Sequence, residues 1–164
     1  MSDVKKFAED HKFKEGLQVN DIFVFGSKIG IGTDSDHFQI GFTSQKLMSR
    51  IPSGIIFHCD ATYKVVKLEY PLIVFGVSDI NRKFYPVAFM FTSYELNVDY
   101  LNFLKSLKRL CIVLNLSFDP KYMVIDASKA LAYAIKIVFP LCLIIMCWFN
   151  SKYNVIHKIL LPTF

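Results

Sequence analysis

From residue 55 onward, apolar runs of strand length alternate with segments of helical periodicity, and this order constrains the fold more than any other feature of the chain. Three runs rich in Ile, Val and Phe come first, at residues 55–59, 72–77 and 85–91. Side chains of these types favour strands, and the short polar segments between the later runs supply turns. The sequence therefore predicts an antiparallel meander of three strands.

The second half of the chain is expected to alternate helices and strands. Helical periodicity and short apolar runs predict a helix over 96–110, a strand over 122–125, a helix over 128–139 and a strand over 141–146. Thr92 and Glu95 fit a capping box, in which two side chains satisfy amides at the start of the first helix. The resulting order, β-β-β-α-β-α-β, predicts an α/β domain with a mixed sheet, whose later strands are parallel and covered by helices.

A nearly continuous apolar stretch over residues 130–149 raises an alternative. About 20 apolar residues are enough to cross a bilayer as a helix. Lys136 interrupts the stretch, however, and Pro140 would break a helix near its middle. We therefore expect a helix that stops at Pro140, then a buried strand, with no membrane span. A small membrane-associated protein is the less favoured interpretation.

The composition agrees with one folded domain of 164 residues. Hydrophobic residues make up 53% of the chain and charged residues 20%, which argues against a disordered protein. Residues 1–50 are more polar and are punctuated by glycine, so we expect them to lead into a domain at residues 51–164. The four cysteines lack C-x-x-C spacing, which favours reduced and mostly buried thiols.

The net charge of +5 suits a polyanionic partner, although many soluble domains are mildly basic as well. Several basic residues of the predicted domain are candidates for a phosphate-facing surface: Lys64, Lys67, Arg82, Lys83, Lys105, Lys108 and Arg109. Scattered surface charge is the competing interpretation.

Two aspartates follow apolar strands that this topology places side by side. Asp60 ends or nearly ends the first strand, and Asp126 follows the fourth. Carboxylates at the ends of neighbouring strands converge, and converging carboxylates hold the divalent ions of phosphoryl transfer. The competing interpretation makes Asp126 the N-cap of the next helix. Asp60 is harder to explain structurally, because an unpaired carboxylate is costly to bury.

The residues around these aspartates resemble the catalytic domain of Mutator-like element (MULE) transposases. The matching features of its opening are Asp60-Ala61-Thr62-Tyr63-Lys64, Tyr70-Pro71, a polar turn at 79–83 and Glu95 at the start of a helix. The segment MVIDASKALAYAIKIVFP, residues 123–140, is similar to the family's second-aspartate motif, and Cys147-Trp148-Phe149-Asn150 to its Cys-x-x-His element. The resemblance covers roughly residues 38–155.

This resemblance implies a ribonuclease-H-like fold and a DDE-type transposase. Asp60 and Asp126 would be its first two catalytic acids and would bind Mg²⁺ or Mn²⁺. In complete relatives the domain would perform metal-dependent phosphoryl transfer on DNA at the transposon ends. We also expect a homo-oligomer and a location in the nucleus.

Two departures from the family pattern limit what the resemblance implies. Asn150 stands where the family has His, and His157 lies off that spacing. The family's third acid is a Glu on a later helix, but no Asp or Glu follows Asp126 here. The sequence therefore predicts a C-terminally truncated domain with weak or no metal binding and no detectable activity. The alternative function is a non-catalytic DNA-binding or interaction module left from a transposon.

Overall fold

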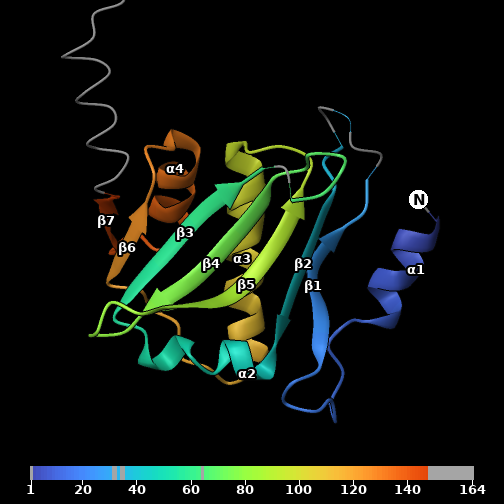
Figure 1. Cartoon of the computed structure of the whole chain (residues 1–164), viewed down its shortest axis with the longest axis horizontal. Helices are drawn as coiled ribbons and strands as arrows, with labels where there is room; N and C mark the ends of the chain where they lie inside the picture. The colour runs from blue at the N-terminus through green and yellow to red at the C-terminus, as the bar shows by residue number, and fades with distance from the viewer. Residues whose placement is uncertain (1, 31–32, 34–35, 64, 148–164) are drawn as a thin grey trace, which may run out of the picture.

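The computed structural model describes residues 2–30, 33, 36–63 and 65–147 (Figure 1). Its strands are β1 (Ile22–Lys28), β2 (Gln39–Ser44), β3 (Ile56–Thr62), β4 (Leu72–Ser78), β5 (Phe84–Thr92), β6 (Tyr122–Ile125) and β7 (Leu143–Met146). Its helices are α1 (Ser2–Asp10), α2 (Gln45–Met48), α3 (Asn97–Val113) and α4 (Lys129–Val138), with a 3-10 turn, η1 (Ile51–Ser53). The described strands form one mixed sheet in the order β1-β2-β5-β4-β3-β6-β7.

From β3 onward the elements follow the predicted order β-β-β-α-β-α-β. Strands β3, β4 and β5 form the predicted antiparallel meander, and β6 and β7 extend the sheet in parallel with β3. Each of the last two strands is reached through a helix, because parallel neighbours need a long crossover. The prediction of an α/β domain with a mixed sheet is confirmed, and the arrangement is compatible with a ribonuclease-H-like fold.

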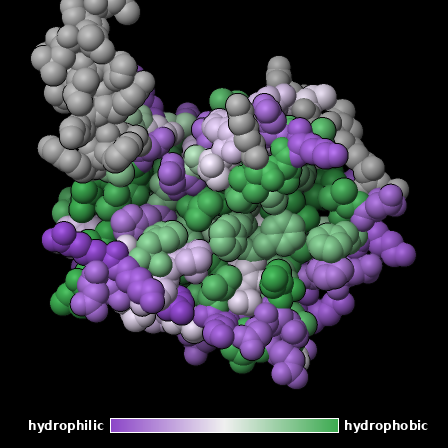
Figure 2. Space-filling view, viewed as in Figure 1, coloured by the Kyte–Doolittle hydropathy of each residue, from purple (hydrophilic) through white to green (hydrophobic). Residues whose placement is uncertain are grey.

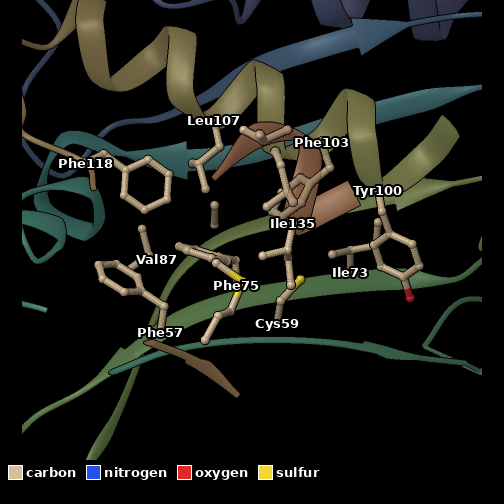
Figure 3. Packing of buried hydrophobic residues seen from close by; sticks show 14 of the residues in the cluster. Phe57, Cys59, Ile73, Phe75, Val87, Tyr100, Phe103, Leu107, Phe118 and Ile135 are labelled. Atoms are coloured by element: carbon tan, nitrogen blue, oxygen red, sulfur yellow. The ribbon is translucent and has the colours of Figure 1, made fainter. Parts of the chain in front are cut away.

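The main core lies between the sheet and the helices α3 and α4, which cover one of its faces (Figure 1). Phe103 and Leu107 from α3 and Ile135 from α4 are fully buried against Phe75 of β4, as Figure 3 shows. Burial of each such side chain contributes about 1.5–3 kcal/mol. This packing holds β3 and β6 as a rigid support for the residues at their ends.

Before residue 50, strands β1 and β2 extend the same sheet, which the polar sequence of this segment did not predict. β1 pairs with β2 and β2 pairs with β5, both antiparallel. A second buried cluster contains Ala8 of α1, Val24 of β1 and Ile40 of β2. The strand residues of this cluster alternate with Phe23, Phe25 and Gly41, so α1 packs on the face opposite α3.

The start of α3 corrects the predicted capping box. Thr92 belongs to β5, and its amide donates to the Pro71 carbonyl oxygen (3.1 Å) instead of opening the helix. The helix begins after Leu96, whose amide donates to Asp99 Oδ2 (2.9 Å). Asp99 therefore does the work assigned to Glu95, because the chain needs several residues to turn from β5 into α3.

Residues 129–146 contain the predicted helix, break and strand, with one correction. Helix α4 ends at Val138, just before Pro140. β7 is not a buried strand: Leu143 is 61% exposed and Met146 is 53% exposed. Its place at the edge of the sheet explains this exposure, since no described strand lies beyond it. Among the described residues, no helix is both long and apolar enough to cross a membrane.

Candidate active site

Asp60 and Asp126 occupy matching positions on neighbouring parallel strands. In the pairing of β3 with β6, His58 faces Val124 and Cys59 faces Ile125. Asp60 and Asp126 are the next residues of the same register. Neighbouring strands lie about 4.8 Å apart, so the two side chains start from adjacent points at one edge of the sheet. The predicted adjacency of the strands is confirmed; the distance between the carboxylates stays a prediction.

Local hydrogen bonds orient both carboxylates and leave each with an open oxygen. Asp60 Oδ1 accepts the amide of Ala61 (2.9 Å), and Asp126 Oδ1 accepts the amide of Ser128 (3.0 Å). Among the described residues, no hydrogen-bond partner is found for the second oxygen of either aspartate. An oxygen of this kind is able to bind a cation or a substrate proton.

Ser128, rather than Asp126, is the N-cap of α4. The Ser128 hydroxyl oxygen accepts the amide of Leu131 (3.2 Å). The structural explanation of Asp126 as a helix cap is therefore wrong. Asp126 orders the turn before the helix, but capping does not require its charge.

A hollow of about 350 Å³ opens beside the two aspartates. Its lining includes both acids together with His58, Thr62, Val74, Phe84, Val124 and Cys147. The view in Figure 2 shows hydrophobic side chains gathered along the middle of the sheet face that α3 and α4 do not cover. Asp60 and Asp126 thus share their hollow with the apolar side chains of Val74, Phe84 and Val124.

His58 contributes to the wall of this hollow as a packed residue. Its Nε2 is hydrogen-bonded to Ser78 Oγ (2.7 Å), and its ring meets Phe84 edge-on at 5.7 Å between centroids. Burial lowers the pKa of His58, which favours the neutral ring. These contacts agree with the interpretation of His58 as a structural residue.

Glu95, which the sequence pattern placed in a capping box, is a third carboxylate whose charge acts on this site. Burial raises the pKa of Glu95, a hydrogen bond from Tyr63 lowers it, and the charges of Asp126 and Asp60 raise it. Its Oε1 atom is buried without a hydrogen-bond partner among the described residues. The sequence held one signal for this position: Glu95 follows β5, which ends at the same edge of the sheet as β3.

The electrostatics of the site indicate accumulated negative charge. Asp60 is exposed, so only partial desolvation raises its pKa; the Ala61 amide lowers this pKa and the charge of Asp126 raises it. Burial also raises the pKa of Tyr100, and the charges of Glu95 and Asp126 add to that effect. Carboxylates that repel one another in this way are stabilised by a bound cation.

The carboxylates of this site are the type of ligand that a hard divalent cation prefers, but they do not form a complete coordination shell. Carboxylate oxygens are the ligands that Mg²⁺ prefers, and the unpartnered oxygen of Glu95 is consistent with a missing positive charge. Within the described ranges, however, no three His, Cys, Asp or Glu side chains are close enough to hold one ion. Mg²⁺ usually keeps several waters and takes one or two carboxylates from the protein, which two aspartates can supply.

The other predicted features divide between described and undescribed residues. Cys147 lines the hollow, whereas Trp148, Asn150, His157 and Lys64 lie outside the described residues. The basic residues proposed for one phosphate-facing surface lie in different surroundings. Lys108 Nζ donates to the Val138 carbonyl oxygen (3.2 Å), and Lys83 lies over the Tyr85 ring. Lys105 and Arg109 line a different surface, on α3.

Comparison with known families gives an independent assignment. The MULE transposase domain matches residues 56–154, which is more than half of the chain and includes both strands that carry the aspartates. No curated protein matches the chain. The matched region begins with β3 and extends past β7; its end agrees with the resemblance over residues 38–155, and its start lies later, at residue 56. The chain belongs to the MULE transposase domain family, which gives it a function related to DNA transposition.

Proposed function

We propose that this chain carries the two-aspartate part of a metal-dependent active site that transfers phosphoryl groups on DNA. The observation that carries the proposal is the parallel pairing of β3 with β6: Asp60 and Asp126 are the residues that follow its last pair, Cys59 and Ile125. The family of the chain supports DNA as the substrate, because transposases act on the DNA at the ends of mobile elements.

In this proposal Asp60 and Asp126 would hold Mg²⁺ through the carboxylate oxygens that have no partner among the described residues. The amides of Ala61 and Ser128 bind the other oxygens and so orient both carboxylates. When bound, the ion would stabilise the negative charge that develops during phosphoryl transfer. The two aspartates would keep that positive charge at this edge of the sheet.

Glu95 adds negative charge to the same site without completing a direct ligand set. Its partially buried carboxylate lies beyond β5, and the charges of both aspartates reach it. The water that Mg²⁺ retains allows such a group to act at a distance. We propose that Glu95 strengthens binding of the ion, and that Asp60 and Asp126 bind it directly.

The test is Mn²⁺ binding, measured by electron paramagnetic resonance of the free ion. The wild-type chain is expected to bind one Mn²⁺. Asp60→Asn and Asp126→Asn are each expected to weaken binding tenfold or more, because each removes a charged ligand, a loss of at least about 1.4 kcal/mol. Asp119→Asn, which removes an exposed carboxylate elsewhere, is the matched control.

Two outcomes would overturn the proposal. If Mn²⁺ binds equally well to the wild-type chain and to both aspartate variants, the site lies elsewhere. If the wild-type chain binds no Mn²⁺ at all, the non-catalytic module becomes the better account.

The proposal also includes a homo-oligomer and a nuclear location, which sedimentation and imaging of the tagged chain would test.

A further inference from the structure

A polar groove runs between α3 and β1, on the helix-covered side of the sheet and apart from the aspartates. Two adjoining hollows, of about 500 and 370 Å³, share Gly26, Ser27, Ser106 and Arg109 in their linings. The second hollow adds Lys28, Asn102 and Lys105. We refer to this surface, defined by Ser27, Lys28, Asn102, Lys105, Ser106 and Arg109, as the α3 groove.

One face of α3 supplies most of the groove. Asn102, Lys105, Ser106 and Arg109 follow the spacing i, i+3, i+4 and i+7, which places them on a single face of the helix. Hydrophobic residues of the opposite face are buried in the main core. The groove is therefore held in place by the rigid part of the fold.

Gly26 forms the floor where β1 comes closest to the helix. Its φ of +58° favours glycine, and an added Cβ would lie 2.7 Å from the Cβ of Ser106. The absence of a side chain on Gly26 leaves room for this close approach, and the half-buried Ser27 and Ser106 line the groove beside it. Hydroxyl and amide donors of this kind hydrogen-bond to phosphate oxygens.

Positive charge exceeds negative charge at the groove. Glu9 also lines the first hollow, but its carboxylate is paired with Lys12 (2.6 Å). Lys105 and Arg109 are exposed and form no ion pair with any described residue. Lys28 lies 3.9 Å from Asp36, which is a loose and solvent-exposed pair. Like charges four residues apart destabilise a helix by about 0.2–0.5 kcal/mol, so this arrangement has no benefit for the fold itself.

We propose that the α3 groove binds the phosphate backbone of DNA, with Lys105 and Arg109 as its main contacts. Four residues of helix separate their positions by about 6 Å along the axis. Phosphates of one strand repeat about every 3.4 Å along duplex DNA, so the two side chains reach phosphates roughly two apart. Ser106 and Asn102 supply neutral donors between them.

This inference rests on the proposal that the chain acts on DNA, but it does not depend on the metal site. The two are therefore tested in different conditions. DNA binding is measured by fluorescence anisotropy of a labelled duplex in EDTA, across a series of salt concentrations, so that no divalent ion contributes.

The decisive variant is Lys105→Gln/Arg109→Gln. It is expected to lower the slope of log K against log salt by about 1.8, since each phosphate contact contributes about 0.9. Lys121→Gln/Lys136→Gln removes the same charge from exposed positions outside the groove and is expected to leave the slope unchanged. The charge-conserving Lys105→Arg/Arg109→Lys is expected to retain most of the slope.

Thermal unfolding of every variant by circular dichroism confirms that each is folded. Equal losses from the groove pair and the control pair would show that net charge alone governs binding, which overturns the proposal. An unchanged slope in the groove variant would overturn it too. If the wild-type chain does not bind DNA in EDTA, the groove proposal fails, while the Mn²⁺ titration still decides the metal site.

Discussion

Asp99 is expected to be one of the most sensitive positions in the fold. It is fully buried, and its carboxylate has three partners: His37 Nδ1 at 2.6 Å, the Gln39 amide at 3.2 Å and the Leu96 amide at 2.9 Å. Asp99→Ala leaves these donors buried around an empty space. Each buried hydrogen-bonding group left without a partner costs about 1–3 kcal/mol, so the loss of this carboxylate should cost at least about 3 kcal/mol. For a chain of this size that loss corresponds to a fall in Tm of at least about 6 °C.

The measurement is urea and thermal unfolding followed by circular dichroism. Asp119→Ala removes an exposed carboxylate and is the matched control, with an expected change within about 0.5 kcal/mol. If the free energy of unfolding of Asp99→Ala lies within about 1 kcal/mol of that of the wild-type chain, less than the cost of one unsatisfied buried group, then Asp99 does not anchor the start of α3.

Three further predictions concern the acids and thiols. Burial raises the folded-state pKa of Glu95 above its unfolded value, so the ionised carboxylate opposes folding. Glu95→Gln should therefore stabilise the chain at pH 7, and this gain should disappear in acid. Urea unfolding at several pH values measures the difference. An equal gain at all pH values would exclude this cause. Iodoacetamide should label Cys147 first in the native chain and Cys111 only on unfolding, because Cys111 is buried and burial raises its pKa to about 12. Labelling is followed by mass spectrometry, and equal labelling rates for Cys111 and Cys147 would argue against the described core. Supercoiled plasmid with Mn²⁺ should show no nicking above background, because Asp60 and Asp126 alone position and neutralise two metal ions less well than three acids would. Nicking that disappears in Asp60→Ala would show that the two aspartates suffice.

The sequence predicted the parts of the fold that depend on local patterns. The runs in 72–77 and 85–91 became β4 and β5 with nearly the same bounds, since short apolar runs between turn residues have few other stable arrangements. The neighbouring positions of Asp60 and Asp126 followed from the preference for a crossover helix between parallel strands. These inferences needed only order and spacing.

What the sequence did not reveal depends on tertiary neighbours. The role of Asp99 rests on contacts with His37 and Gln39, about 60 residues away in the chain. Likewise, the exposure of β7 follows from its edge position and not from its composition. Glu95 matched a capping motif, but the strand before it extends to Thr92 and pushes the helix start beyond it. No local pattern distinguishes these cases.

The most direct test of the metal site is a crystal structure of the chain soaked in Mn²⁺, with anomalous diffraction measured at the manganese edge. We expect one anomalous peak between the ends of β3 and β6, with oxygens of Asp60 and Asp126 at about 2.1–2.2 Å from the ion. Carboxylates more than about 8 Å apart, too far to share one ion at such ligand distances, or a peak elsewhere with none at these aspartates, would contradict the account.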